Sequence, residues 1–314
     1  MTIPWWDEYI DTIEMSAADW LEINGTLKTD KQLAEEISTF TDRSVTIPAV
    51  RQKRQSMGVA KPMVRFKQSS RQRFDGYIRV TTDNILVISD LHIQFHDPEW
   101  LGAVVNFAVR KGIKILIIAG DLIDFEGLSP FPRPTRGNDT EQPSNATELQ
   151  CVQDILKQLV LIFDEVIILL GNHEERLARK LGDMTTSILG TLFGINGTCA
   201  RISEYHFCVV ETSDEQLWRI THPHNASSLS VRVASKLADK YGQNIVVAHG
   251  HDWGVTTSAS GHYVAACGVI ADPSKIEYVS TKDSTYPFMQ QGAWALVDGA
   301  PIILHPKWAH PDRY

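Results

Sequence analysis

Cysteine is scarce in this sequence, and its four cysteines are scattered without a CxxC pair. A framework of disulfide bonds needs paired cysteines at regular spacings, as in small secreted domains. Such a framework is therefore not expected, and the cysteines are interpreted as reduced residues of a cytosolic protein. They are Cys151, Cys199, Cys208 and Cys267.

Long apolar runs are absent as well, since no run approaches the roughly 20 residues that a membrane-spanning helix needs. The first residues, which include Trp5, Trp6, Asp7 and Glu8, lack the basic start and apolar stretch of a signal peptide. Hydrophobic residues make up 43% and charged residues 22% of the chain, as in soluble globular proteins. We therefore expect a soluble, cytoplasmic protein with no membrane partner.

Positive charge is in short supply, because 30 basic residues face 38 acidic ones and the formal net charge is -8. The deficit is uneven along the chain. Residues 1–50 hold three basic and ten acidic residues, whereas residues 51–79 hold nine basic residues against Asp75 alone. A basic block between two acidic regions favours a polyanionic partner, while a solvated linker is the plainer alternative. Charge alone leaves both interpretations open.

The domain organisation follows from these composition shifts. A length of 314 residues allows one large domain or two of ordinary size. The patterns favour a small helical domain over residues 1–60, a basic linker over 61–80 and a larger domain over 81–314.

Two short helices separated by a turn are expected within the first domain. Asp30 is positioned to cap the first helix, and the second is expected to begin near Ile47. The pattern resembles a helix-turn-helix, whose basic second helix would enter a major groove of DNA. A small helical bundle that docks on the larger domain or mediates oligomerisation is the alternative. The candidate nucleic-acid contacts are Arg51, Lys53 and Arg54.

From residue 84 onward, apolar runs alternate with helical segments, which predicts an α/β domain. Buried strands are expected at 85–88, 115–119, 166–170 and 245–248. Helices are expected at 98–110, 145–162 and 227–241. Later runs typical of antiparallel strands are 263–269, 276–279, 293–297 and 302–304. A long exposed loop that shapes access to a site is expected at 129–144.

Five short polar motifs follow one another along this larger domain. They are Asp90-Leu91-His92, Gly120-Asp121, Gly171-Asn172-His173-Glu174, His222 and His249-Gly250-His251. All but the fourth directly follow a predicted buried strand. The carboxyl ends of such strands are where open α/β sheets place their active sites. Oxygen and imidazole ligands that converge there suit a pair of divalent cations, which clamps a phosphoryl group for hydrolysis.

In this order, the motifs resemble those of the calcineurin-like metallophosphoesterases. The resemblance covers residues 84–305 and implies a four-layer α/β/β/α sandwich of two mixed sheets, preceded here by a small all-α domain. It also implies a metal-dependent phosphoester hydrolase whose nucleophile is a hydroxide that bridges two metal ions. Mn, Fe and Zn all fit the mixed nitrogen and oxygen ligands. A helical module before such a domain is similar to proteins encoded by bacteriophages or bacteria.

The resemblance implies a role for each motif residue. Asp121 is implied as the carboxylate shared by both cations, and His173 as the general acid that protonates the leaving oxygen. The other implied ligands are Asp90, His92 and His251 for one cation, and Asn172, His222 and His249 for the second. His222 is preferred in the fourth motif, with His224 as the fallback.

Three residues beside the motifs are interpreted from their positions in the sequence. Asp124 is placed either to orient a ligand or to cap the next turn. Glu174 is expected to hydrogen-bond a histidine, as carboxylates behind metal ligands commonly do. Arg176 is near enough to contact a phosphate, although a surface position on a helix is the alternative.

Three functions are compatible with these patterns. The first is a phosphodiesterase or nuclease acting on nucleic acid, which the basic block and the helix-turn-helix pattern favour. The second is a phosphomonoesterase acting on a phosphoprotein, nucleotide or small metabolite, which the acidic charge of the larger domain favours. The third is a non-catalytic DNA-binding protein, which is disfavoured because every ligand position holds a competent residue. Arg133 and Arg136 in the long loop are candidates for offsetting the acidic charge.

Overall fold

The computed structural model describes residues 28–56, 75–128, 144–181, 186–276 and 288–314. The chain divides into two compact units, Met1–Arg73 and Phe74–Tyr314, and each is described by itself. Residues 61–74 of the predicted linker, and Arg133 and Arg136 of the predicted long loop, lie outside the described residues. Among the helices within the described ranges, none is long and apolar enough to cross a membrane.

Within residues 28–56, the described part of the first unit, the chain forms the helices α2 (Asp30–Thr41) and α3 (Ile47–Ser56), as the sequence predicted. The cap of α2 differs from the prediction. Thr29 and not Asp30 is the N-cap, because Thr29 and Gln32 form a reciprocal capping box. The two helices pack through a small apolar core made of Leu33, Ala34, Ile37 and Val50.

Asp30 has a different role, since its carboxylate joins α2 to α3. It lies 3.2 Å from Nε of Arg51 and also forms an ion pair with Arg54. Arg54 is only 3% exposed, so its guanidinium serves the helix pair and is not presented to a nucleic acid. The prediction of Arg54 as a nucleic-acid contact is therefore wrong. Arg51 stays largely exposed despite its ion pair.

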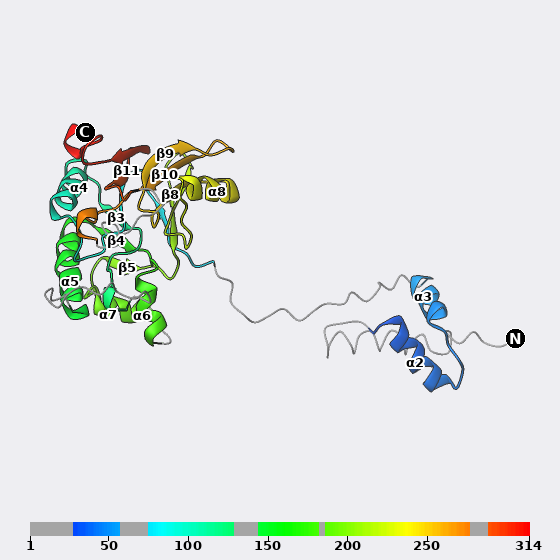
Figure 1. Cartoon of the computed structure of the whole chain (residues 1–314). Coiled ribbons are helices and arrows are strands. Elements are labelled where there is room, and N and C mark those ends of the chain that lie inside the picture. The colour runs from blue at the N-terminus through cyan, green and yellow to red at the C-terminus, as the bar shows by residue number, and fades with distance from the viewer. Residues whose placement is uncertain (1–27, 57–74, 129–143, 182–185, 277–287) are drawn as a thin grey trace. The chain divides into compact units, whose positions relative to one another are not determined.

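The second unit is built on two six-stranded sheets (Figure 1). The first sheet has the order β12-β11-β2-β3-β4-β5, and the second has the order β1-β6-β7-β8-β10-β9. The strands of the first sheet are β2 (Ile85–Ile88), β3 (Ile115–Ile118), β4 (Glu165–Ile168), β5 (Ala200–Ile202), β11 (Ala293–Val297) and β12 (Ala300–Leu304). Those of the second are β1 (Arg79–Thr81), β6 (Phe207–Glu211), β7 (Leu217–Thr221), β8 (Asn244–Val247), β9 (Trp253–Thr257) and β10 (Tyr263–Cys267).

Helices cover the outer faces of both sheets in this unit. They are α4 (Pro98–Arg110), α5 (Asn145–Ile162), α6 (Glu174–Leu181), α7 (Thr186–Leu192) and α8 (Arg232–Tyr241). The predicted bounds of α4 and α5 are confirmed. Helix α8 begins at Arg232, five positions later than predicted, after a segment of turns and bends. The described residues of this unit also form the short 3-10 helices η1 (Glu126–Leu128), η2 (Pro273–Lys275) and η3 (Pro311–Arg313).

The last part of the chain differs from prediction in one pairing. Strand β10 is antiparallel to β9, which was not among the expected strands, and parallel to β8 on its other side. Ile276 follows η2 instead of starting a strand, and residues 277–279 lie outside the described residues. Strands β11 and β12 form the predicted antiparallel pair.

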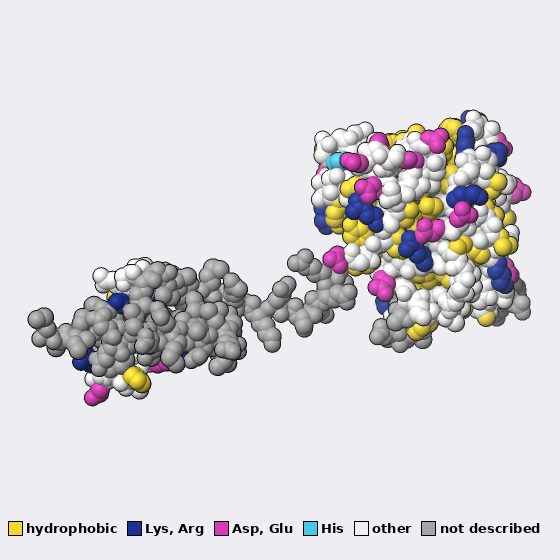
Figure 2. Space-filling model, turned by 180° about the vertical axis from the view of Figure 1, so that it is seen from behind, with side chains coloured by type: hydrophobic (Ala, Val, Ile, Leu, Met, Phe, Trp, Pro, Cys, Tyr) yellow, Lys and Arg dark blue, Asp and Glu magenta, His cyan; other side chains and the backbone are white. Residues whose placement is uncertain are grey.

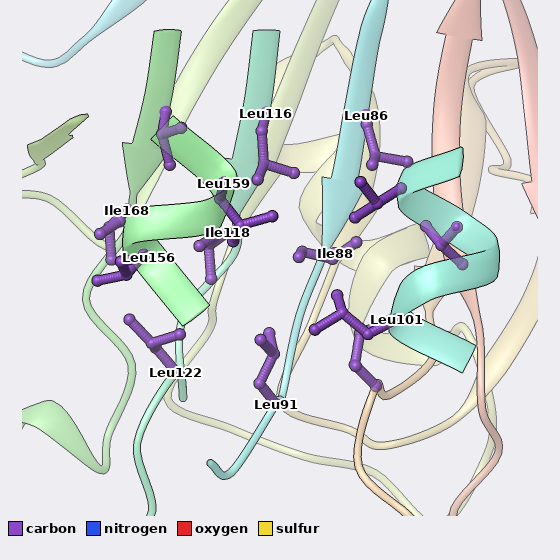
Figure 3. Close-up of a cluster of buried hydrophobic side chains, with 14 of the residues drawn as sticks. Leu86, Ile88, Leu91, Leu101, Leu116, Ile118, Leu122, Leu156, Leu159 and Ile168 are labelled. Atoms are coloured by element: carbon purple, nitrogen blue, oxygen red, sulfur yellow. The ribbon is translucent and has the colours of Figure 1, made fainter. Parts of the chain in front are cut away.

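Strand β2 is apolar on both faces because both faces are covered. Leu86 and Ile88 belong to an outer core under α4 and α5, whereas Ile85 and Val87 belong to an inner core between the sheets. Figure 3 shows the outer core, where side chains of β2, β3 and β4 meet Leu101 of α4 and the α5 residues Leu156 and Leu159.

The second sheet shows the same alternation, which completes the layers. Val246 of β8 faces the inner core, while Ile245 and Val247 pack against Ala234 and Ala238 of α8. The order of layers is therefore helix, sheet, sheet, helix. This confirms the predicted α/β/β/α sandwich of two mixed sheets.

Candidate metal centre

Four of the five motifs lie just beyond the carboxyl ends of β2, β3, β4 and β8, and the fourth motif residue, His222, follows β7. Backbone hydrogen bonds continue past the strand ends and hold the first two motifs together. The N–H groups of Asp90 and His92 donate to the carbonyls of Gly120 and Asp121. The motifs therefore meet at one edge of the sandwich, as their positions after the strands predicted.

The backbone at this edge is bent into the left-handed region at five non-glycine positions. The φ angles are 50° at Asp90, 41° at His92, 49° at Asp121, 71° at His249 and 56° at His251. Such conformations are unfavourable for residues with a side chain and persist where the surrounding structure imposes them. The bends turn successive side chains towards a common point, which a regular strand does not do.

The first donor set comprises Asp90, His92, Asp121 and His251, whose ligand atoms all lie within 4.8 Å of one another. Nε2 of His251 is 3.1 Å from Oδ1 of Asp90 and 3.2 Å from Nε2 of His92. That spacing is typical of two nitrogens bound to one cation at about 2.0–2.1 Å each.

The second donor set comprises Asp121, His222 and His249, together with Asn172. Nε2 of His222 lies 3.4 Å from Oδ2 of Asp121 and 3.2 Å from Oδ1 of Asn172. Asp121 belongs to both sets, which is the arrangement expected of a bridging carboxylate. His222 is buried in this set, whereas the fallback His224 is exposed and outside it.

Two glycines leave the space that the donors occupy. A Cβ atom on Gly120 would overlap the imidazole of His222, and one on Gly171 would overlap Oδ1 and the backbone N of Asp121. Gly120 also has a φ of 87°, which side chains rarely allow. The glycines of the second and third motifs are therefore part of the site.

The donor atoms fit divalent cations, as two buried atoms show. Within the described residues, Nδ1 of His249 is buried without a hydrogen-bond partner, and the buried Oδ1 of Asp90 faces Nε2 of His251, a donor of the same set, at 3.1 Å. Buried polar atoms are normally satisfied, so such atoms mark a place for a bound ion. Oxygen and imidazole donors suit Mn, Fe or Zn, and the residues present fit a pair of such cations.

The charges of the two sets interact strongly. Burial raises the pKa of Asp121, but the imidazoles of His222 and His173 lower it, and the net pKa is well below the usual value. Burial lowers the pKa of His222, but Asp121 raises it to about 10. Burial and the neighbouring His222 lower the pKa of His249 to about 4. A divalent cation would therefore displace a proton from His222 but find His249 already neutral.

Glu174 supports the site through the backbone, and the predicted hydrogen bond to a histidine is wrong. Its buried carboxylate accepts hydrogen bonds from four backbone N–H groups, those of Gly171, Asp121, Leu122 and Ile123, at 2.8, 3.1, 2.9 and 3.3 Å. These groups belong to the turns that carry Asp121 and Asn172. Glu174 therefore fixes the two turns relative to each other.

His173 lies beside the donor sets and is held from two sides. Its Nδ1 is 2.8 Å from the carbonyl of Asp124, and its Nε2 is 2.7 Å from Nη2 of Arg176. A carbonyl only accepts, so the neutral ring carries its proton on Nδ1 and presents Nε2. Burial lowers the pKa of His173, but Asp121 and Asp124 raise it, with a net upward shift.

Asp124 and Arg176 both reach into the site. Oδ1 of Asp124 lies 2.9 Å from Nδ1 of His92 and thus orients that imidazole, which is the first of the two roles considered for Asp124. Arg176 donates to the carbonyl of Asp124 and contacts His173. It is partly buried against the site and does not point freely into solvent.

A comparison with protein families decides the identity of this fold and site. A family model described as calcineurin-like phosphoesterase matches residues 84–292. The chain belongs to the calcineurin-like phosphoesterase family. It is a metal-dependent hydrolase of phosphoester bonds. The family typically binds two divalent cations, and the two donor sets hold candidate ligands for them.

Individual relatives of this phosphoesterase are distant. The Gene 54 protein of Mycobacterium phage L5 is 23% identical over 194 residues, which cover 57% of this chain and 72% of that protein. Vacuolar Protein Sorting 29 from Cryptosporidium parvum has a TM-score of 0.39 and 13% identity, covering 71% of this chain and 95% of that one. The phosphoesterase Yfce from E. coli has a TM-score of 0.36 and 15% identity, covering 71% of this chain and 98% of that one.

The structure also brings together residues of the phosphoesterase that, apart from the fallback ligand His224, the sequence did not single out. Glu175, His206 and His224 form a further donor group beside the second donor set. His206 has no sequence signal, because it stands in a turn before β6 far from any motif. Trp253 and Trp308 also pack against each other, with ring centroids 5.7 Å apart, and their only signal is that Trp253 follows the fifth motif closely.

Proposed function

We propose that this phosphoesterase binds one divalent cation with the first donor set and a second with the second donor set, sharing Asp121. The observation that carries the proposal is the pair of buried donor sets joined by one carboxylate. When bound, the two cations supply Lewis-acid stabilisation of the phosphoryl oxygens and acidify water. Mn, Fe and Zn each fit the donors, and manganese is the first to test.

His173 is proposed as the general acid that protonates the leaving oxygen. Its Nε2 faces the donor sets, 3.8 Å from Oδ2 of Asp121. The hydrogen bond to the carbonyl of Asp124 fixes the ring orientation. Arg176 contacts the same Nε2 and is proposed to move to a phosphate oxygen when substrate binds, since its guanidinium suits a phosphate.

The proposed substrate is a phosphodiester within a nucleic acid. The basic block of residues 51–79 supplies a partner for the phosphate backbone, although Arg54 no longer contributes. Arg51 and Lys53 remain candidate contacts at the start of this block. An electrostatic role of this kind needs no sequence-specific contact.

A cluster of aromatic rings that includes Trp253, which is close in sequence to the fifth motif, also favours nucleic acid. Trp308 stacks on His305 with ring centroids 4.1 Å apart, and Trp253 packs against both rings. Trp253 stands two positions after His251, and Trp308 is 55% exposed. An exposed indole held by stacked neighbours is a suitable platform for a nucleobase.

A phosphomonoesterase remains the second candidate, because the catalytic unit itself is acidic. Residues 80–314 carry 18 basic and 27 acidic side chains. Figure 2 shows basic and acidic side chains interspersed on the face of this unit that is in view. A small phosphomonoester does not require an extended basic surface, whereas a polynucleotide does.

A panel of metals and substrates tests the proposal. The chelated protein is reloaded with Mn²⁺, Fe²⁺ or Zn²⁺ and assayed on a bis-aryl phosphodiester, an aryl phosphomonoester, and single- and double-stranded DNA. We expect cleavage of the diester and of DNA, with Asp121→Asn inactive throughout. Hydrolysis of the monoester alone would refute a nucleic-acid phosphodiester as the substrate. Unchanged activity of Asp121→Asn would refute the role of Asp121 as the carboxylate shared by both cations.

A second experiment addresses the basic block in the full chain. Replacing Lys61, Arg65, Lys67, Arg71 and Arg73 by Gln should weaken DNA binding and flatten its dependence on salt, because fewer counterions are released. Hydrolysis of the small diester should not change. Equal DNA affinity of both proteins would contradict a role for this block.

A further inference from the structure

Three donor side chains outside the proposed dinuclear centre converge beside it. Oε1 of Glu175 is 3.0 Å from Nε2 of His206, and the rings of His206 and His224 have centroids 4.5 Å apart. One ligand atom from each of the three residues lies within 4.8 Å of the others. They come from the start of α6, the turn before β6 and the loop after β7, so only the fold brings them together.

The central imidazole is oriented as a metal ligand. Nδ1 of His206 lies 2.7 Å from the carbonyl oxygen of Leu170, which can only accept a hydrogen bond. The proton of the neutral ring is therefore on Nδ1, and the Nε2 lone pair points towards Glu175. Metal-binding histidines are commonly held in this way by a hydrogen bond on the second ring nitrogen.

The cluster is anchored to the second donor set through the backbone. The carbonyl of His206 accepts hydrogen bonds from the N–H of His222 at 2.8 Å and from the hydroxyl of Thr221 at 3.1 Å. The N–H of Glu175 approaches the carbonyl of Gly171 at 3.4 Å. Two of the three donors are therefore fixed to the turns that carry His222 and Asn172.

We propose that Glu175, His206 and His224 form a third cation site, separate from the dinuclear centre. Two imidazoles and one carboxylate are a ligand set typical of zinc, with a fourth position left for water or a ligand oxygen. The set favours Zn²⁺ or Co²⁺ over Mg²⁺ or Ca²⁺, which prefer oxygen ligands alone. The other carboxylate oxygen of Glu175 contacts Arg179 at 3.3 Å, which leaves Oε1 for the cation.

The third site should bind more weakly than the dinuclear centre. His224 is exposed, and the side chains of Glu175 and His206 are 29% and 26% exposed, so water competes for the cation. Its single carboxylate also supplies less negative charge than the two carboxylates of the first donor set. A third cation there would place positive charge beside the second donor set, where an anionic substrate can reach it.

Metal stoichiometry of the full chain tests the proposal without relying on activity. Chelated protein is titrated with Zn²⁺ by calorimetry, and the bound zinc is counted by mass spectrometry after gel filtration. We expect two tight equivalents and a third, weaker one. His224→Ala and Glu175→Gln should each lose the third equivalent or weaken it at least tenfold, which corresponds to about 1.4 kcal/mol.

The controls separate this site from surface binding and from the dinuclear centre. His224 is exposed, so its loss should leave the fold intact, and Glu175→Gln keeps the size of the side chain. His262→Ala removes a histidine outside the donor groups of the described residues and should keep three equivalents. Two equivalents in the wild type, or three of unchanged affinity in both site variants, would overturn the proposal. So would loss of the third equivalent in the His262 variant.

Discussion

Replacing Glu174 by Gln should destabilise the catalytic unit, because one carboxylate serves four backbone N–H groups. Oε2 accepts from Gly171 and Asp121, and Oε1 accepts from Leu122 and Ile123. A glutamine has a single oxygen, so two hydrogen bonds are lost in either orientation of the amide. The new NH₂ group then faces two N–H donors inside a buried pocket.

The expected loss in the free energy of unfolding follows from the number of hydrogen bonds lost. Two bonds to a charged group, at about 1.5–3 kcal/mol each, give a loss of roughly 3–6 kcal/mol in the free energy of unfolding. Burial and repulsion by Asp121 raise the pKa of Glu174. The neutral glutamine is free of this repulsion, which favours the lower end of the range of free-energy losses. For a unit of this size the unfolding temperature should fall by roughly 6–24 °C.

Calorimetry of the chelated protein measures this effect without interference from bound cations. The matched control is Glu204→Gln, which makes the same chemical change at an exposed position and should leave the unfolding temperature unchanged. An unfolding temperature for Glu174→Gln within about 2 °C of the wild type would refute the reasoning, since it leaves less than about 1 kcal/mol for the two lost hydrogen bonds.

Three further predictions concern the neighbouring groups. Gly171→Ala should destabilise the unit by about 1–3 kcal/mol through overlap with Asp121, whereas Gly102→Ala, in open space on α4, should stabilise it by about 0.5–1 kcal/mol; urea unfolding compares them. The pKa of His222 is raised from 6.5 to about 10, so the chelated protein should lose folding free energy as pH rises through this window. Calorimetry across that range checks it, and a flat profile would count against the pairing with Asp121. Arg176→Gln should raise the pKa of His173, because Arg176 lowers it, and move the basic limb of the kcat profile to higher pH. A limb that stays in place or moves to lower pH would argue against His173 as the acid.

Local signals explain why the four buried strands before the motifs and two long helices could be predicted closely. Helix α4 begins where Asp97 caps it and Pro98 occupies its first turn, and both signals are adjacent in the sequence. Strand β2 is four apolar residues followed directly by a polar motif. The parallel pairing of β10 with β8 was not predictable in this way, because it depends on which strands become neighbours after folding.

In the site, too, features with a local sequence signal could be predicted, whereas features that depend on the folded arrangement could not. The donor residues could be named because ligand chemistry and position after a strand are both visible in the sequence. The partners of Glu174 were missed because they are backbone groups of two separate turns, and backbone groups leave no trace in residue types. Arg54 was misjudged for a related reason, since its partner Asp30 lies on the preceding helix and comes within reach only when the helices pack.

One hydrogen bond across the centre has a consequence for the time at which this enzyme becomes active. The backbone N–H of His249 donates to Oδ2 of Asp90 at 3.1 Å, and the two residues are 159 positions apart. Neither donor set is complete until both sheets have docked. During synthesis, the helical unit of residues 28–56 leaves the ribosome long before His251 does. Any partner of those helices can therefore be engaged while the nascent chain is still unable to hydrolyse a phosphoester.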